Sequence, residues 1–452
     1  MSFTIFNTLS REKEVFEPFK DGHVGMYTCG PTVYNYLHIG NWRAYIFADL
    51  LRRFLEYRDY KVNHIMNITD VDDKTIRSSQ EQGKTLKEFT ELYTEGFFKD
   101  RDALNILPAS KYTKATDYIN EMVSLIKRLE EKGFAYKTND GSIYFDIHKD
   151  KEYGKLSHFK LSELKENADN RLNKDEYEKE NAQDFALWKS WTPEDGDVYW
   201  ETELGKGRPG WHIECSAMSM NNLGESFDIH TGGVDNIFPH HENEIAQSEC
   251  ATGKSFAKYF MHNEHLMVDG QKMSKSLGNF YTVSDLVKKG IDPIAFRFWL
   301  YTSNYSTRTN FTLETVNGSQ TALQRLRESF LSLGDSSGGE INMNYKAHFV
   351  EFLDNNLDSP KAITVVWELL KDSSISDKDK KATILDFDRV LGLGLDKIKK
   401  EEIPEEITIL VSSREEARKQ KDWAKSDELR IKINELGYEI KDTGDGSKIS
   451  KI

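Results

Sequence analysis

The sequence has few cysteines, and this excludes one class of protein. Its 452 residues include three, Cys29, Cys215 and Cys250, and these are scattered along the chain. Small secreted domains that depend on disulfide bonds carry cysteines in larger numbers and at closer spacing. The count therefore argues against a disulfide framework and fits a reducing compartment.

Long apolar runs are also missing. No stretch approaches the roughly 18 apolar residues that a membrane-spanning helix needs. The first residues, MSFTIFNTLSREKEVFEPF, lack both the apolar centre of a secretory signal and the arginine-rich, acid-poor pattern of a transit peptide. We therefore expect a cytoplasmic protein with no membrane partner.

Positive charge is in deficit, with a formal net charge of -14. This argues against binding of nucleic acid by bulk attraction alone. It does not exclude a local basic groove, because charges more than about 10 Å apart are screened from one another. Hydrophobic residues at 38% and charged residues at 30% are typical of a globular protein, and the length is sufficient for about two to four domains.

The stretch from Gly22 to Asn41, GHVGMYTCGPTVYNYLHIGN, carries the first functional signal. It begins as a buried strand should, and an amphipathic helix is predicted from Trp42 to Tyr57. The letters HIGN fall where that helix begins, and free N–H groups and the helix dipole favour a phosphate there. Gly40 would let the backbone approach the anion while His38 donates a hydrogen bond. Read alone, such a histidine more often only caps its helix.

A second strand, Tyr60 to Thr69, follows that helix, so the chain forms a βαβ unit with a parallel sheet. Ligands bind beyond the carboxyl ends of such strands, where Cys29 to Gly40 and Thr69 to Asp73 lie. We expect DVDDKT to be a loop. Two helices, a short strand and an exposed loop are predicted next, over Leu86–Leu104, Lys114–Lys132, Gly141–Ile147 and Lys165–Asp184.

The region from roughly 115 to 205 is interpreted as an insertion, with a small core of Trp188, Trp191 and Trp200. The character of the chain changes past about residue 310, where amphipathic segments are separated by breaks such as DSSGGE. This pattern predicts a helical bundle and then a charged helix that ends at Gly437. The predicted helices are Ile294–Tyr301, Leu313–Leu333, Tyr345–Asn356, Pro360–Leu370, Lys378–Leu391 and Ser413–Leu436.

Cys29, Cys215, His240 and Glu244 are the best candidate metal ligands. On a helix that starts at Pro239, His240 and Glu244 are four residues apart and project toward one point, whereas His241 has Ile245 at that spacing. Two thiolates, an imidazole and a carboxylate suit Zn²⁺. The wide separation of the cysteines leaves a buried free thiol at Cys29 as the alternative. Cys250 has no partner and is interpreted as a core residue.

The segment KMSKS, Lys272 to Ser276, follows a strand-like stretch, FMHNEHLMVDG. Two lysines, Lys272 and Lys275, flank small residues there. In a mobile loop they could close on a triphosphate and stabilise the charge that develops as pyrophosphate leaves. The alternative is a solvated basic loop.

HIGN and KMSKS together resemble the signature pair of class I aminoacyl-tRNA synthetases. The wider motifs resemble cysteinyl-tRNA synthetase over almost the whole chain, in the order MYTCGPTVYNYLHIGN, NITDVDDKT, PGWHIECSAM, GGVDNIFPHHENEIAQSE, KMSKSLGN and REEARKQKDWAKSDELRIKINELGYEIKDT. The resemblance implies an α/β fold, in which a Rossmann-like parallel-sheet catalytic domain with an insertion precedes an α-helical bundle and a small anticodon-binding tail. The implied domains are 1–310 (KMSKS and stem-contact region roughly 255–310), 311–400 (tRNA-binding) and 401–452.

The resemblance also implies an activity. Cysteine and ATP would give cysteinyl-adenylate and pyrophosphate, and cysteine would then pass to the terminal adenosine of tRNA(Cys). The implied cofactors are one Zn²⁺ per chain, which binds the substrate thiolate, and Mg²⁺ with ATP. The implied partners are tRNA(Cys), L-cysteine and ATP, and the family suggests a monomer. Since metal binding would reject serine, which lacks the thiol, we expect no editing domain.

Residue roles carry over from the family motifs. The catalytic set is His38, Asn41, Lys272 and Lys275, and the ATP-binding set is Pro31, His38, Gly40, Asn41, Asp235 and Lys275. Substrate-pocket positions are Cys29, Gly30, Thr69 and Trp211, and the metal ligands are Cys29, Cys215, His240 and Glu244. Anticodon positions are Arg418, Asp427 and Asp442, because unpaired loop bases can be read by hydrogen bonds and stacking.

Two departures and three alternatives accompany this interpretation. Asn41 stands where the usual signature has His, so the phosphate contact cannot carry charge there, and the tail GDGSKISKI lacks the tryptophan that the family often has near its end. The rivals are a ligase that joins cysteine to an amino sugar, a non-catalytic zinc-containing tRNA-binding paralogue, and a small nucleotidyltransferase. The region from 311 to 452 argues against the first and third, and the intact signature and ligand residues argue against the second.

Overall fold

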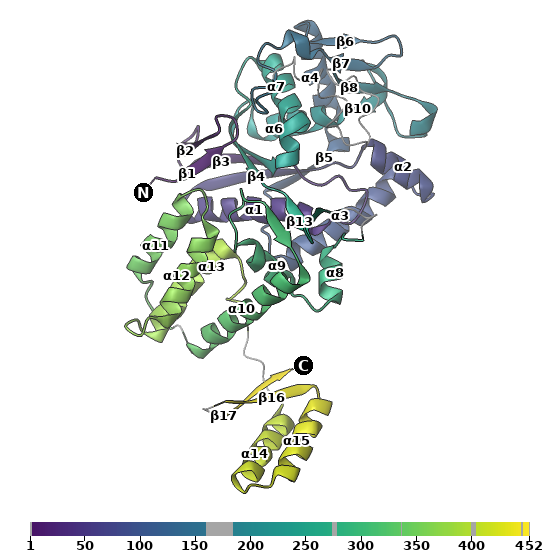
Figure 1. Ribbon diagram of the computed structural model, residues 1–452. Helices are drawn as coiled ribbons and strands as arrows, with labels where there is room; N and C mark the ends of the chain where they lie inside the picture. The colour runs from purple at the N-terminus through teal and green to yellow at the C-terminus, as the bar shows by residue number, and fades with distance from the viewer. Residues whose placement is uncertain are drawn as a thin grey trace. The chain divides into compact units, whose positions relative to one another are not determined.

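The computed structural model describes residues 2–159, 184–273, 278–335, 337–398, 404–443 and 446–451. The chain divides into two compact units, Met1–Asp396 and Lys397–Ile452 (Figure 1). The expected loop over Lys165–Asp184 lies almost entirely outside the described residues, as does Lys275 of KMSKS. Within the described part, no helix is long and apolar enough to cross a membrane.

A five-stranded parallel sheet forms the centre of the first unit, in the order β12-β11-β3-β4-β5. Its strands are β3 (His23–Thr28), β4 (Lys61–Ile68), β5 (Lys111–Lys114), β11 (Phe227–Gly233) and β12 (Ala257–Asn263). Apolar side chains of the central strands, such as Val24, Met26 and Ile229, are fully buried. The predicted α/β class is confirmed.

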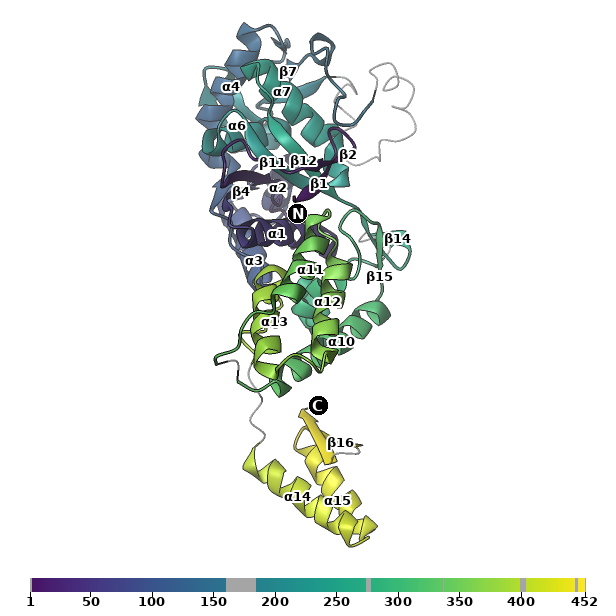
Figure 2. The same ribbon diagram turned by 90° about the vertical axis from the view of Figure 1, so that its left-hand side faces the viewer.

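Helices cover both faces of this sheet, as Figures 1 and 2 show. On one face lie α1 and α3, and on the other lie α6 and α7. The helices are α1 (Ile39–Tyr57), α2 (Asp73–Glu81), α3 (Leu86–Ala103), α4 (Ile119–Glu131), α6 (Trp211–Leu223) and α7 (Glu242–Thr252). Apolar residues on both faces, such as Trp42 of α1 and Met218 of α6, are completely buried, so the helices cover an apolar layer on each side of the sheet.

Two local predictions in this region need correction. DVDDKT is not a loop throughout, because Asp72 caps α2 by accepting a hydrogen bond from the Lys74 N–H at 2.8 Å. A carboxylate at that position satisfies a backbone donor that the helix itself leaves unpaired. The helix predicted from Lys114 begins only at Ile119, since Lys111–Lys114 completes the parallel sheet as β5.

The insertion is a second five-stranded sheet, in the order β6-β7-β8-β10-β9, and its paired strands are antiparallel. The strands are β6 (Ala135–Lys137), β7 (Ile143–Phe145), β8 (Phe185–Ser190), β9 (Trp200–Thr202) and β10 (Gly205–Pro209). Trp188 is fully buried, whereas Trp191 and Trp200 are only partly buried. The prediction of a three-tryptophan core holds for Trp188 and for Trp200, which packs against the hydrophobic cluster that contains Trp188. Trp191 is not part of that cluster, and the Lys206 ammonium lies 3.8 Å from its ring centroid.

Two small sheets complete the first unit. A hairpin of β1 (Thr4–Asn7) and β2 (Glu12–Val15) opens the chain. The strand-like stretch before KMSKS supplies β12 and then β13 (Leu266–Val268), which pairs with β14 (Gln271–Lys272) and β15 (Thr309–Phe311).

A group of helices packs beyond α1, on the side of the sheet away from α6 and α7 (Figures 1 and 2). The four predicted bundle helices past residue 310, and the separately predicted helix Ile294–Tyr301, are confirmed with ends that differ by at most two residues, and α8 is additional. The helices are α8 (Val283–Lys288), α9 (Pro293–Leu300), α10 (Leu313–Ser332), α11 (Met343–Asp354), α12 (Ser359–Lys371) and α13 (Asp377–Leu391). Arg297 of α9 is completely buried, pairs with Asp49 of α1 and donates to the Leu391 carbonyl at 2.9 Å. This ion pair ties the bundle to the sheet domain.

The second unit contains α14 (Glu405–Lys419), α15 (Trp423–Glu435), β16 (Tyr438–Thr443) and β17 (Gly446–Lys451). The single helix predicted over Ser413–Leu436 is wrong, because the backbone turns at Lys421, whose φ is 62°. Asp422 then caps α15 by accepting from the Lys425 N–H at 3.1 Å. The core of this unit is small and consists of Ile407, Val411, Ile433 and Ile440.

Candidate functional site

The carboxyl ends of β3 and β11 define the place of the candidate site. These strands are neighbours, but the chain leaves β3 toward β4 and leaves β11 toward β12, in opposite directions along the sheet. Helices that follow two such strands diverge to opposite faces and leave a crevice between them, where ligands of parallel sheets bind. The two strand ends are joined at this point by a hydrogen bond from the Cys29 N–H to the Thr231 carbonyl, at 3.2 Å.

The four predicted metal ligands meet at this crevice. Cys29 follows β3, Cys215 lies on α6, and Glu244 lies in the first turn of α7, with His240 just before that helix. The Sγ atoms of Cys29 and Cys215 are 4.0 Å apart, Cys29 Sγ is 3.6 Å from Glu244 Oε1, and His240 Nε2 is 3.0 Å from the same oxygen. One ligand atom from each residue lies within 4.8 Å of all the others, and all four residues are buried. This cluster could hold a metal ion.

The spacing of the cluster fits a tetrahedral ion. Two sulfur ligands at about 2.3 Å from a tetrahedral zinc would lie about 3.8 Å apart, and the observed separation is 4.0 Å. The regular helix begins at Glu242 rather than at Pro239, because Ile237–His241 forms a separate turn with an extended residue at Phe238. The His240–Glu244 pair forms nevertheless, since the turn continues into α7.

Neighbouring groups of opposite charge shift one another's pKa values inside the cluster. Burial by itself would lower the pKa of His240, but the charges of Glu244 and Cys215 outweigh it and raise the pKa to about 10. Burial would likewise raise the pKa of Glu244, yet His230 and His240 lower it to about 2. The pKa of Cys215 falls to about 6, because a hydrogen bond from Cys29 and the His240 charge overcome burial. A metal ion bound there would displace the proton of His240, because an imidazole coordinates a metal in its neutral form.

Four further histidines surround the cluster and were missed by the sequence analysis. His241 Nε2 lies 3.3 Å from Cys29 Sγ, and His230 Nε2 lies 2.9 Å from Glu244 Oε2, so Cys29, His230, His241 and Glu244 form an overlapping second set of possible ligands. His241 had been set aside because Ile245 occupies the position one helical turn later. That argument considers only the residue's own helix, whereas His241 reaches across to the end of β3. His212 and His262 complete the ring through contacts of 2.9 and 2.8 Å to His240 and His241.

His38 caps α1 at the mouth of the crevice. Its Nδ1 accepts a hydrogen bond from the Asn41 N–H at 3.2 Å, and the Asn41 side chain accepts one from the His38 N–H at 3.3 Å. An imidazole that accepts at Nδ1 carries its proton on Nε2. Burial lowers the pKa of His38 to about 4, although Asp235 raises it in part. His38 is therefore a neutral hydrogen-bond donor at neutral pH, and a Cβ at Gly40 would lie only 2.9 Å from its Nδ1.

The segment after KMSKS lies against His38. The Ile39 N–H donates to the Tyr281 carbonyl at 2.9 Å, and the His38 ring meets the Phe280 ring edge-on, with 5.2 Å between centroids. Lys272 ends β14 with an exposed side chain, and its carbonyl accepts from Asn279 Nδ2 at 3.2 Å. The two signature segments are therefore adjacent within the described residues, which stop at Met273 and resume at Gly278.

The predicted substrate-pocket residues lie beside the metal ligands. Gly30 donates its N–H to Asn67 Oδ1 at 2.7 Å, and a Cβ there would lie 1.7 Å from the Asn67 carbonyl oxygen, so no larger residue fits. Thr69 is buried and pairs through its backbone with Pro31 and Val33 at 3.0 and 3.1 Å. Trp211, at the first turn of α6, stacks on the His240 ring with 4.0 Å between centroids. The ring of Trp211 therefore lies in direct contact with one of the predicted metal ligands.

The three anticodon candidates lie in the second unit. Asp442 pairs with Arg418, and the buried Arg414 donates two hydrogen bonds to its carboxylate at 2.8 and 3.0 Å. Asp427 is exposed on α15. Arg414, which the sequence analysis did not single out, fixes the position of Asp442.

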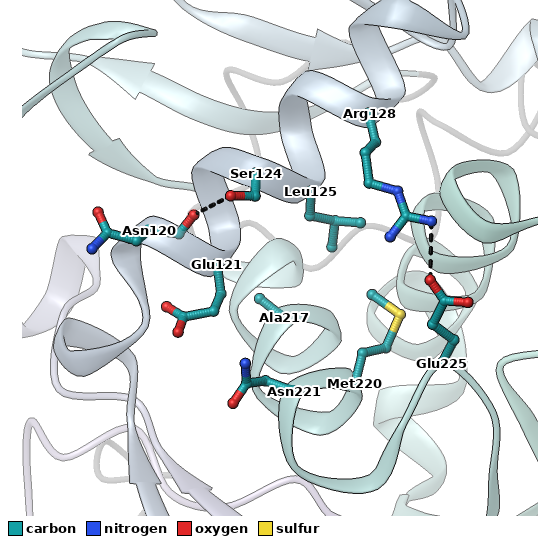
Figure 3. A pocket seen from close by; sticks show the side chains of 9 residues that line it. All are labelled: Asn120, Glu121, Ser124, Leu125, Arg128, Ala217, Met220, Asn221 and Glu225. Atoms are coloured by element: carbon teal, nitrogen blue, oxygen red, sulfur yellow. Dashed lines mark hydrogen bonds and ion pairs between the residues drawn. The ribbon is translucent and has the colours of Figure 1, made fainter.

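A cavity of about 340 Å³ lies outside this site, between α4 and α6. Figure 3 shows Ser124 and Arg128 of α4 facing Ala217 and Met220 of α6, with Arg128 bonded to Glu225. None of its lining residues belongs to the predicted site.

Known proteins match the chain along its whole length. Residues 15–321 match the family model for the catalytic domain of class I tRNA synthetases (C), and residues 400–448 match the cysteinyl-tRNA ligase anticodon binding domain. The cysteine–tRNA ligase of Brachyspira hyodysenteriae is 46% identical, over 98% of both chains. That of Chlamydia muridarum is 43% identical, over the full length of both.

Solved structures share the fold at much lower identity. A Mycobacterium tuberculosis methionyl-tRNA synthetase in complex with methionyl-adenylate aligns with a TM-score of 0.57 at 15% identity, over 82% of this chain and 90% of that one. An Agrobacterium radiobacter LeuRS in a ternary complex with tRNA aligns with a TM-score of 0.60 at 11% identity, over 84% and 85% of the two chains. From the catalytic and anticodon-domain matches and the full-length identity, we conclude that the chain belongs to the class I cysteine–tRNA ligase family.

Proposed function

We propose that this protein activates L-cysteine with ATP and transfers it to the terminal adenosine of tRNA(Cys). The observation that carries the proposal is the convergence of two thiols, an imidazole and a carboxylate beside a capped helix start, at the crevice of a class I synthetase sheet. A metal ion held by this thiol-rich cluster could also bind the side chain of cysteine, because a thiolate is itself a metal ligand. His38 and its neighbours suit a phosphate.

Cys29, Cys215, His240 and Glu244 would hold one zinc ion. A zinc ion bound there would coordinate the substrate thiolate, which serine's hydroxyl cannot replace, and would so select cysteine. His230 Nε2 lies 2.9 Å from Glu244 Oε2, the oxygen that does not face His240. His212 Nδ1 lies 2.9 Å from His240 Nδ1. Such outer contacts orient ligands and set their basicity.

In the first step the cysteine carboxylate attacks the α-phosphate of ATP, and pyrophosphate leaves. The neutral His38 donates from Nε2 to the phosphate, and Asn41 holds the imidazole in that tautomer through the cap of α1. Lys272 and Lys275 neutralise the charge on the departing pyrophosphate. Mg²⁺ bound with ATP would neutralise a further part of the phosphate charge. Pro31 and Gly40 line the nucleotide path, and Asp235, whose charge acts on His38, binds the ribose or the amino group.

In the second step a ribose hydroxyl of the terminal adenosine attacks the adenylate carbonyl, and AMP leaves. The enzyme forms no covalent intermediate, so its contribution is mainly to hold the reacting groups in position. Gly30, Thr69 and Trp211 hold the amino acid during both steps. Arg418, Asp427 and Asp442 contact the anticodon.

The amino-sugar ligase is the nearest rival, and the match of residues 400–448 to an anticodon binding domain disfavours it. A non-catalytic tRNA-binding paralogue would not require the His38 cap and the ligand cluster together. We further propose a cytoplasmic monomer, with domains at 1–310, 311–400 and 401–452. Light scattering of the purified chain tests the monomer.

The decisive experiment is ATP–pyrophosphate exchange with cysteine and serine in parallel, on protein whose zinc content has been measured. Cys215→Ser should lose both the metal and cysteine-dependent exchange. Cys250→Ser, which removes the thiol outside both ligand sets, should keep both. Bound metal without exchange on either amino acid would refute the synthetase proposal and favour the tRNA-binding paralogue.

A further inference from the structure

The loop between Cys29 and His38 presents two exposed tyrosines that the proposed chemistry does not use. Tyr34 is 39% exposed and Tyr36 is 47% exposed, whereas Val33 beside them is buried. Within the described residues, neither hydroxyl makes a hydrogen bond to the protein. Both rings are therefore open to a ligand beside the predicted reaction centre.

Both rings are held in place from one side. The Tyr36 ring packs edge-on against Tyr93 of α3, with 5.1 Å between centroids, and a Cβ at Gly96 would lie 2.8 Å from Tyr36 Cε1. The Lys74 ammonium lies 5.5 Å from the centroid of the Tyr34 ring. The charge of Lys74 also acts on the neighbouring carboxylate of Asp72. The loop therefore offers flat, anchored rings beside a cation.

Aromatic rings next to a positive charge are the usual platform for unpaired nucleotides. Every base can stack on a flat ring, and the cation binds the phosphate between successive bases. The position of the loop narrows the choice of nucleotide ligand, because the loop connects a proposed metal ligand to the proposed phosphate-binding histidine. Of the proposed substrates, only the 3′ end of the tRNA is a run of unpaired bases that must reach that point.

We propose that Tyr34, Tyr36 and Lys74 form the platform on which the unpaired 3′ end of the tRNA stacks, so that its terminal ribose reaches the adenylate. This inference rests on the proposed function. Tyr36 is a positioning residue, which acts on the transfer of cysteine and not on its activation. The adenine of ATP is the competing occupant, and the experiment separates the two.

The test compares both reaction steps in single-site variants. Tyr36→Leu keeps an apolar side chain against α3 but removes the flat ring, and Tyr36→Phe keeps the ring. We expect Tyr36→Leu to slow cysteine transfer to tRNA about 10- to 100-fold, the range for loss of one base–aromatic stack. Tyr36→Phe should transfer like the parent. In both variants, ATP–pyrophosphate exchange should keep its KM for ATP and for cysteine.

A second variant moves the ring without removing it. Gly96→Ala places a methyl group against Tyr36 and should also reduce transfer, with exchange retained. Phe19→Ala is the matched control, because Phe19 is 56% exposed, has Lys258 5.8 Å from its ring, and precedes β3 at the amino end of the sheet. It should change neither step.

A tRNA whose terminal base is 2-aminopurine supplies a direct readout of stacking. Its fluorescence should be quenched by the parent and by Tyr36→Phe, and less by Tyr36→Leu. Unchanged quenching and transfer in Tyr36→Leu would overturn the inference, and so would a raised KM for ATP, which would assign the rings to the ATP adenine. If the parent itself fails to activate cysteine, the proposed function fails first, so the two failures are distinguishable.

Discussion

Glu244 and Asp442 are both acids held by two basic partners, but they lie in contrasting surroundings. Glu244 is fully buried between His230 and His240, with contacts of 2.9 and 3.0 Å. Asp442 has a side chain that is 37% exposed and is held by Arg414 and Arg418. Contacts around Glu244 act in a low dielectric and are costly to leave incomplete, whereas those around Asp442 are weakened by water and salt.

The difference matches what each unit is proposed to do. A metal ion and the reacting carboxylate of the substrate must be held by side chains that keep their positions during the reaction. Burial fixes the positions of such side chains. Bases of an anticodon are read by side chains that must leave water, so those side chains stay exposed in the free protein. The second unit accordingly has a core of four buried apolar residues and exposes Ile409, Trp423 and Ile431.

The largest effect should follow from Glu244→Gln. The variant leaves His230 and His240 buried without their anion, and breaking a buried pair in this way costs about 3–5 kcal/mol. We expect loss of bound metal, a decrease in urea-unfolding free energy of that size, and at least about 100-fold slower cysteine exchange. Metal analysis and urea titration measure these changes.

Glu225→Gln is the matched control, since Glu225 pairs with Lys254 and Arg128 at the surface. Exposed pairs contribute about 0–1 kcal/mol, so the control should bind metal and activate cysteine normally. Equal destabilisation by both variants would show that burial does not distinguish the two kinds of pair.

Arg414→Met should lower the stability of the second unit and leave that of the first unchanged. Arg414 is 3% exposed and is the one described arginine that makes two hydrogen bonds to Asp442. Its loss should destabilise the second unit by about 2–4 kcal/mol, because two hydrogen bonds to a charged group are lost together. A loss of that size matters in this unit, because a small core has little stability in reserve. Hydrogen exchange of the full chain should accelerate in 404–443 while the parallel sheet and cysteine activation are unaffected. Faster exchange of the sheet would contradict the independence of the units.

Between pH 7 and pH 5, where histidines titrate, acid should act mainly on the first unit, since residues 397–452 contain no histidine. His64 is buried, its Nε2 lies 2.9 Å from Thr28 Oγ1, and burial lowers its pKa from 6.5 to about 3. Between those values the unfolded chain binds a proton that the folded chain does not, so stability falls as the pH falls. His64 alone should cost about 2 kcal/mol by pH 5.

His64→Gln tests this assignment. The variant should start less stable at pH 7, because the buried contact to Thr28 changes. Its unfolding free energy should then decrease less steeply between pH 7 and pH 5, by about 1 kcal/mol per pH unit. Urea titrations at three pH values measure the slope, and identical slopes in parent and variant would show that His64 does not take up the proton.

The sequence predicted those parts of the molecule that depend on local patterns. The parallel βαβ unit, the bundle helices and the His38 helix start follow from periodicity and capping, which act over a few residues. Cys29 and Cys215 are adjacent only because β3 and α6 pack together, and no spacing in the sequence shows that contact. His241 was misjudged for the same reason, since its contact lies across the crevice. The turn at Lys421 was missed because no glycine or proline marks it.

Asp427→Asn should have the smallest effect on the protein itself and so gives the sharpest test of the exposed unit. Asp427 is exposed on α15, and substitutions at such positions change stability by less than about 0.5 kcal/mol. If its carboxylate reads an anticodon base, kcat/KM for tRNA should fall about tenfold, the value of one good hydrogen bond to a charged group. Glu428→Gln changes the adjacent exposed acid in the same way and should leave charging intact. Equal charging by both variants would remove Asp427 from the anticodon contacts, and its carboxylate would then serve only to keep the surface of α15 hydrated.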